Sequence, residues 1–452
     1  MFKGIYVQKQ LGTRRGRQKV VQAIGTSLVL MTFSGVVSAQ GAAPQMLAAQ
    51  PATISPPAAA DPAPLTLSQA IAQALESNPE VAAATRQVQA SEGQVLQGQA
   101  RPNPELAYSL EDTRSQTRSQ SWQINLPIER GGKRDARTKA AQKAREQAQA
   151  ELEEVKATLR ANVVAAYFEA LAARERLALA QDSVSLAKAT TGNVSNRVAA
   201  GKVSPVEETK AKVAEAGVRV ELAQAVSEER NAQTRLAALL GKAPASPLVL
   251  DGKAPSAPAV PAAQDLQALV SSSPTLVRAR LEVDRRRALT AVEQSKTVPD
   301  VTVSLGVKRS NETQRNMALL GVSVPLPVFD RNQGNLLEAL RLEDKARDEL
   351  QAATLRVHSE IAQAREKAIS VAAEIQALEL EVLPGAKSAY DAAIVGFENG
   401  KFNFLEVLDA QRTYLAAKSQ YLKAVAEAHR AAADMARLLG NSFPTGQSTP
   451  LN

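Results

Sequence analysis

The chain has 452 residues, a formal charge of +8, no cysteine and only 3% aromatic residues. Without cysteine it cannot form disulfide bonds, thiolate metal sites or an acylated N-terminal cysteine. The low aromatic content is more typical of long helices that pack side by side through small residues than of a compact aromatic core.

The first 39 residues have the pattern of a secretory signal peptide. Six basic residues and no acidic one accompany a mostly apolar run from Val20 to Val37, and Ser38-Ala39 offers a small-residue cleavage site before Gln40. The apolar run is too short and too interrupted for a membrane span. Removal of this segment would leave a charge near +2, which takes away the main argument for a nucleic-acid partner. We expect an exported protein without a lipid anchor and without bound nucleic acid.

The rest of the chain consists of two repeated halves. Residues 40–64 are predicted to be an Ala/Pro-rich tether, 243–263 a linker and 441–452 a flexible tail. Residues 65–242 and 264–440 share landmarks in the same order at a shift of about 195 to 200 residues, which predicts a tandem duplication. The matching landmarks are Asn78-Pro79 and Ser273-Pro274, Pro104-Glu105 and Pro299-Asp300, Leu126-Pro127 and Leu326-Pro327, Gly201 and Gly400, and Leu240-Gly241 and Leu439-Gly440.

Each half contains two short segments in which apolar residues alternate with polar or small ones. The segments cover about residues 105–112, 119–127, 300–308 and 318–326. A period of two predicts strands with one apolar face and one polar face. The apolar positions are Leu106, Tyr108, Leu110, Trp122, Ile124, Leu126, Val301, Val303, Leu305, Val307, Leu320, Val322 and Val324.

Two runs, from Gly132 to Ala200 and from Gly334 to Asn399, have the pattern of very long helices. Their apolar residues recur at steps of three and four, and many of them are alanine, which predicts closely packed coiled coils. At 1.5 Å per residue each run would extend roughly 100 Å, several times the thickness of a bilayer. These helices must therefore stand in water.

A glycine and a lysine end each long helix, at Gly201-Lys202 and at Gly400-Lys401. Glycine adopts the left-handed conformation that ends a helix, and lysine is favourable at its negative terminus. After the first glycine, Ser204-Pro205 and two acidic residues form a helix start. Each glycine is predicted to be the tip of a helical hairpin.

Four strands with one apolar face cannot close into a barrel with an open lumen, and a lone hairpin leaves its edges unpaired. In an exported protein the alternation fits the wall of an outer-membrane barrel to which several copies contribute. The alternative is a small sheet packed on helices in a soluble periplasmic coiled-coil scaffold. Long helices favour the first interpretation, because they can continue a barrel as a tube but cannot wrap a small sheet.

Three stretches resemble the TolC-type outer membrane factors, and the duplication does so as well. The stretches are LPIERGGKR at 126–134, PLPVFDRNQG at 325–334 and FENGKFNFLEVLDAQ at 397–411. The cluster at 102–106 together with 129–134 is most similar to the CzcC branch of that family, which serves heavy-metal resistance pumps. The resemblance extends over nearly all of residues 65–440.

The resemblance implies a mainly α fold with a small β part. A homotrimer would share a twelve-stranded β-barrel in outer membrane lipid, continued by a periplasmic α-helical barrel. It also implies docking to a periplasmic membrane-fusion adaptor and to an inner-membrane, proton-driven RND transporter. The cargo would be heavy-metal cations of the cobalt, zinc and cadmium type, with an organic-solute or drug channel as the alternative.

The resemblance also assigns candidate sites at the two hairpin tips. Adaptor contacts map onto Arg197, Gly201, Ser204 and Gly400. Glu406 and Asp409 lie three residues apart on one helical face and match the acidic pair of the family's tunnel entrance. In a trimer they would form a ring of carboxylates that attracts cations and serves as a gate. A partly hydrophobic constriction is expected from Phe402 and Phe404.

No catalytic, nucleotide or cofactor motif is found in the sequence. Neither Gly-Lys pair belongs to a phosphate-binding loop, and His358 and His429 are not at a ligand spacing. We therefore expect no enzyme activity, no cofactor and no metal site, and metal specificity is expected to come from the partner proteins.

Overall fold

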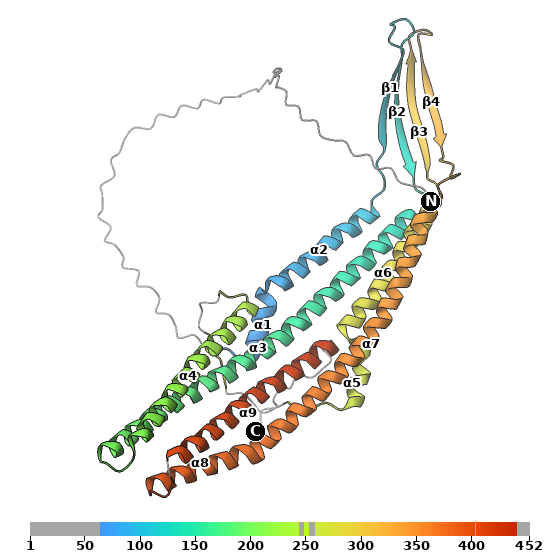
Figure 1. Cartoon of the computed structure of the whole chain (residues 1–452). Coiled ribbons are helices and arrows are strands. Elements are labelled where there is room, and N and C mark those ends of the chain that lie inside the picture. The colour runs from blue at the N-terminus through green and yellow to red at the C-terminus, as the bar shows by residue number, and fades with distance from the viewer. Residues whose placement is uncertain (1–63, 244–247, 253–257, 403, 441–452) are drawn as a thin grey trace, which may run out of the picture. The chain divides into compact units, whose positions relative to one another are not determined.

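The computed structural model describes residues 64–243, 248–252, 258–402 and 404–440 (Figure 1). The predicted signal peptide and tail, and all but the last residue of the tether, lie outside these ranges. The described part is mainly helical with one small antiparallel sheet, which confirms the predicted fold class. None of its helices combines the length and apolar character needed to cross a bilayer.

The sheet joins the two halves of the chain edge to edge. Each half contributes one hairpin, and the strand order is β1-β2-β3-β4 with antiparallel neighbours throughout (Figure 1). The outer edges of β1 and β4 pair with no other described strand. The strands are β1 (Glu105–Glu111), β2 (Ser119–Ile128), β3 (Val301–Ser310) and β4 (Arg315–Ser323).

The position of β4 differs from the expected 318–326. The strand begins three residues earlier, at Arg315, and ends at Ser323. The pairing of β4 with β3 ends with Ser323 opposite Thr302, next to the first residue of β3, and Pro325 and Pro327 beyond it offer β3 no backbone N–H.

The two faces of the sheet differ as the alternation predicts. Most of the apolar side chains are on one face and are exposed there; Leu106 pairs with Ile124, and Ile124 with Leu305, at 53–68% exposure. Met317 and Leu319 of β4 are exceptions on the other face. On the other face, short polar side chains bond across the strands. Ser109 and Ser121 hydroxyls lie 2.6 Å apart, and Ser304 Oγ donates to Asn125 Oδ1 at 2.8 Å. The sheet thus has a bare apolar face and a hydrogen-bonded polar face.

The first two helices of the chain start at capping residues. Thr66 and Gln69 exchange side-chain to backbone hydrogen bonds at the start of α1, which is a capping box. Asn78 Oδ1 accepts the Glu80 N–H at 2.8 Å, and Pro79 occupies the first position of α2. The helices are α1 (Leu67–Ser77), α2 (Pro79–Gln99), α3 (Lys133–Ala199) and α4 (Pro205–Leu239).

In the second half the long helix is not uniform, contrary to expectation. A π-helical turn over Leu378–Val382 interrupts it, and the next helix has Pro384 as its second residue. Proline removes one backbone donor, and a π turn accommodates the resulting change in the hydrogen-bond ladder. The elements are α5 (Ala263–Leu269), a 3₁₀ turn η1 (Val270–Ser272), α6 (Pro274–Lys296), α7 (Gln333–Ala377), the π turn η2, α8 (Leu383–Glu398) and α9 (Phe404–Leu439).

Helix α3 connects the halves, because it packs against α2 and α4 of its own half and against α6 and α9 of the other. Phe168 on α3 stacks on the buried His429 of α9 with ring centres 3.6 Å apart. The adjacent Glu169 carboxylate pairs with Arg235 of α4 at 2.8 Å and with Arg430 of α9 at 3.1 Å. His429 is therefore part of the packing between α3 and α9.

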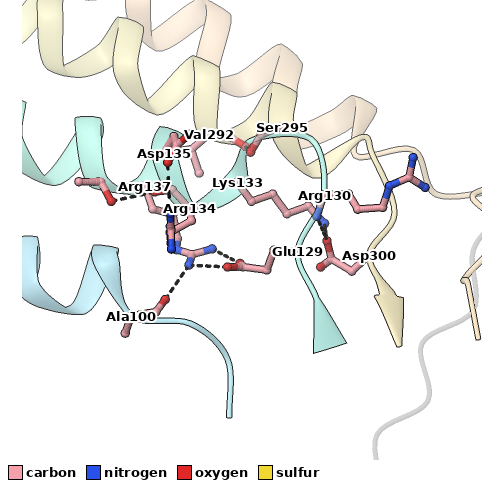
Figure 2. Close-up of polar contacts among 11 residues, drawn as sticks. Ala100, Glu129, Arg130, Lys133, Arg134, Asp135, Arg137, Val292, Ser295 and Asp300 are labelled. Atoms are coloured by element: carbon pink, nitrogen blue, oxygen red, sulfur yellow. Dashed lines mark hydrogen bonds and ion pairs between the residues drawn. The ribbon is translucent and has the colours of Figure 1, made fainter. Parts of the chain in front are cut away.

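A polar cluster fixes the point where the strands meet the helices (Figure 2). Asp300, just before β3, pairs with Lys133 Nζ at 2.8 Å and accepts the Arg130 N–H at 3.0 Å. Glu129 and Arg137 form a two-point ion pair, and Arg137 also donates to the carbonyl at the end of α2. Burial by itself raises the pKa of Asp300, but Lys133, the Arg130 N–H and the charge of Arg137 together hold that pKa below its usual value.

Candidate functional site

Both helical hairpins end in the same backbone motif. Gly201 has φ +66°, and the Lys202 N–H donates to the Arg197 carbonyl at 2.9 Å. Gly400 has φ +72°, and the Lys401 N–H donates to the Gly396 carbonyl at 2.8 Å. This six-to-one bond at a left-handed residue is the Schellman motif. The turn geometry predicted for both glycines is confirmed, whereas their contact with an adaptor stays a prediction.

The first hairpin restarts with a capped helix. Ser204 Oγ accepts the Val206 N–H at 3.3 Å, and Pro205 is the first residue of α4. Lys212, and then Ser195 Oγ, donate to the Glu208 carboxylate and lower its pKa. An ionised acid in the first turn is favourable beside the positive end of the helix dipole.

The two hairpin ends touch each other through Phe397 of α8. The Arg197 guanidinium of α3 lies 4.9 Å from the centre of the Phe397 ring, which is a cation–π distance. Sequence reasoning did not reveal this contact, because the two residues are far apart in the chain. The ring belongs to a small apolar cluster with Val194, Val198, Ala211 and Leu408.

Glu406 and Asp409 line one groove of about 440 Å³ between α8 and α9. Both are exposed on the first turns of α9, and their spacing of three residues places them on one face. Apart from Phe402, small residues form the rest of the lining and leave the carboxylates accessible to ions. They are Ala386, Ala389, Ala393, Ala410 and Thr413.

Phe402 borders the same groove and is held by a close approach to α8. Its ring packs on Gly396, where an added Cβ would lie only 2.2 Å from a ring carbon. The ring remains 45% exposed. Phe404 begins α9, but its side chain lies outside the described part, so its place in a constriction stays a prediction. The structure thus brings Phe402, Glu406 and Asp409 together.

The groove does not resemble a coordination site. Across the described ranges, no three His, Cys, Asp or Glu side chains gather in a way that could hold a metal ion.

Comparisons with known proteins identify the family. A model of the family described as "Outer membrane efflux protein" matches residues 70–242 and 266–441. The chain is 45% identical over 377 residues to the cobalt-zinc-cadmium resistance protein CzcC of Cupriavidus metallidurans, covering 83% of this chain and 90% of the relative. It is 29% identical to the nickel and cobalt resistance protein CnrC of the same organism, covering 71% and 75%.

Among solved structures, the outer-membrane channel OprN shares the fold. It has a TM-score of 0.71 and 20% identity, with coverage of 83% of this chain and 89% of that one. The family matches both repeated halves, and the CzcC relative is matched over most of its length. On this evidence, the chain belongs to the outer membrane efflux protein family.

Proposed function

We propose that the protein is the outer-membrane exit channel of a multi-component efflux system for heavy-metal cations. The observation that carries the proposal is the sheet, whose apolar side chains are exposed on one face and whose outer strands pair with no further strand of the described residues. A bare apolar face is unfavourable in water and favourable in lipid. Unpaired strand edges are likewise unfavourable unless another chain pairs with them.

Three copies would remove both problems at once. Three sheets of four strands close into a barrel of twelve strands, an even number as in bacterial outer-membrane barrels. The apolar face would then contact lipid, while the serine and asparagine face would line the lumen. The long helices continue from the strands and would form a periplasmic tube. Its far end would carry Arg197, Gly201, Ser204 and Gly400 as the contact surface for a periplasmic adaptor.

Divalent transition-metal cations are the cargo that the observations favour. The most similar relatives reported above are named for resistance to cobalt, zinc and cadmium and to nickel and cobalt. In a trimer, Glu406 and Asp409 would place a ring of carboxylates at the tube entrance, which raises the local concentration of cations. The channel itself would be passive, with no chemistry of its own, and energy would come from an inner-membrane RND transporter.

A deletion strain tests the cargo. Loss of the gene is expected to sensitise cells to zinc, cobalt and cadmium, and the intact gene on a plasmid should restore resistance. Sensitivity to hydrophobic compounds with unchanged metal resistance would instead assign the channel to organic solutes. In a strain that already lacks the partner transporter, deletion of the gene should cause no further sensitivity to these metals, because the two proteins act in series.

Fractionation tests the channel itself. The protein is expected in the outer membrane as a trimer that requires detergent, with its signal peptide removed. A monomer that stays in buffer after removal of membranes would support a periplasmic scaffold and refute the channel.

A further inference from the structure

The turn that leads from β2 into α3 packs tightly against the linker that leads from α6 into β3. Arg130 and Lys133 of the turn bind Asp300 of the linker, as described above. Between them, a Cβ on Gly131 would lie 2.7 Å from Val298 Cβ, so turn and linker are in direct contact. Just inside the sheet, Leu126 of β2 lies opposite Val303 of β3 on the apolar face.

The duplication supplies an equivalent for each strand of this contact, although the ion pair of Lys133 is not repeated, because Gln333 stands at its equivalent position. Strand β2 and its turn correspond to residues 200 positions later, and α6 with β3 corresponds to residues 195 positions earlier. The observed registers obey these shifts. The pair Ala107 and Gln123 of the first hairpin becomes Thr302 and Ser323 of the second, which is the observed pair. Asn332 also adopts the left-handed conformation of its equivalent Gly132, directly before α7.

Applied to the contact between β2 and β3, the shifts give a contact between β4 and β1. Leu126 opposite Val303 becomes Leu326 opposite Tyr108. Within one chain this contact cannot form, because β4 and β1 are the two outer strands of the sheet (Figure 1). Leu326 is 80% exposed, and Phe329 beyond it is 92% exposed.

Two further features fit this pairing. The apolar face would continue without a break across the contact, with Val324 opposite Leu110 and Val328 opposite Leu106. Charges beyond the strand also match. Asp330 and Arg331 follow the β4 side, Arg101 precedes β1 and Glu105 is its first residue. None of these four exposed side chains forms an ion pair with another described residue.

We propose that residues 324–328 extend β4 and pair with β1 of a second copy of this chain in the register that the duplication dictates. Leu326 then lies opposite Tyr108 of the next copy, and Arg331 lies two residues beyond the position opposite Glu105, as its diagonal neighbour on the next copy. The contact fixes how far one copy is shifted along the next, and thereby the tilt of the strands in the closed barrel. It rests on the proposed function, since it joins copies of a shared barrel.

Another register is possible and gives a sharp control. Pairing the full observed lengths of β4 and β1 would place Leu320, rather than Leu326, opposite Tyr108. Both leucines are exposed, at 78% and 80%. The two registers therefore predict different cross-links between equally accessible positions.

Cysteine pairs distinguish these registers, because the chain has no cysteine of its own. Oxidation of the variant Leu326→Cys with Tyr108→Cys is expected to give covalent dimers and trimers on a non-reducing gel, since residues directly opposite have Cβ atoms about 4.5–5.5 Å apart. The variant Leu320→Cys with Tyr108→Cys should stay unlinked. The equivalent pair within one chain, Leu126→Cys with Val303→Cys, should form a disulfide inside the monomer. Its band on the non-reducing gel should therefore show no dimer or trimer.

A charge exchange provides a second measurement without altering the strands. Arg331→Glu or Glu105→Arg alone should lower the temperature at which the trimer dissociates, and the double variant should restore it. A disulfide between copies through Leu320→Cys instead of Leu326→Cys would overturn the proposed register. So would an intact trimer in which neither cysteine pair forms a disulfide and the double charge variant restores nothing. A monomer in all variants would overturn the proposed channel and this contact together.

Discussion

The Arg197 guanidinium lies 4.9 Å from the centre of the Phe397 ring, and this contact joins the ends of the two helical hairpins. A cation over an aromatic ring contributes about 0.5–1 kcal/mol at an exposed site. Arg197→Ala is therefore expected to increase amide hydrogen exchange at both tips, around Gly201 and Gly400, by a factor of roughly 2–5. Arg197→Lys keeps the charge and should have a smaller effect. Faster exchange at the first tip alone would show that the contact does not couple the hairpins.

Removal of the two carboxylates in the groove should change how cations affect the channel. For the variant Glu406→Ala with Asp409→Ala, divalent cations are expected to block single-channel current in planar bilayers at clearly higher concentrations than in the wild type. The reason is that the carboxylates attract cations to the entrance. Asp348→Ala with Glu349→Ala removes the same charge from the exposed surface of α7 and is the control. Block of the current at the same cation concentration in all three proteins would show that Glu406 and Asp409 do not act as a gate.

The same substitution should have opposite effects at two glycines. Gly201 has φ +66° with no atom near its Cβ position. Gly201→Ala is therefore expected to lower the free energy of unfolding by about 1–2 kcal/mol through backbone strain alone. Gly217 lies inside α4 with equally open space around its Cβ position. Gly217→Ala should raise the free energy of unfolding by about 0.5–1 kcal/mol, because alanine has the higher helix propensity. Thermal unfolding in detergent measures both. A stabilised Gly201→Ala would contradict the Schellman turn.

The cluster around Asp300 should contribute stability that depends on pH. The folded-state pKa of Asp300 is lowered, so its contribution is present above the ordinary aspartate value of 3.8 and is lost as pH falls through the folded-state pKa. Asp300→Asn is expected to destabilise the protein by about 1 kcal/mol at neutral pH, a modest value because the pair is partly exposed. The difference between variant and wild type should shrink as the pH is lowered below 3.8.

Denaturation at a series of pH values measures this effect. Asp348→Asn, at an exposed position on α7, is the control and should change stability by less than about 0.5 kcal/mol. A difference for Asp300→Asn that stays constant from neutral to acid pH would show that the carboxylate charge is not the cause.

The sequence by itself determined the elements of this protein and their duplication. Periods of two and of three to four residues depend only on which face of a strand or helix is apolar, so they were visible at Leu106 to Leu110 and along the seam of α3. The left-handed turns at Gly201 and Gly400 were equally visible, because few residues other than glycine adopt that conformation. The shared face of Glu406 and Asp409 followed from helical geometry.

Tertiary structure alone decided which distant residues meet. Nothing local to Arg197 or Phe397 indicates that they are in contact, and the same holds for Phe168 with His429 and for Lys133 with Asp300. The π turn before Pro384 and the early end of β4 also depended on where backbone donors find acceptors in three dimensions. Periodicity fixes the direction in which a side chain points, but its partner is set by packing between elements that are far apart in the chain.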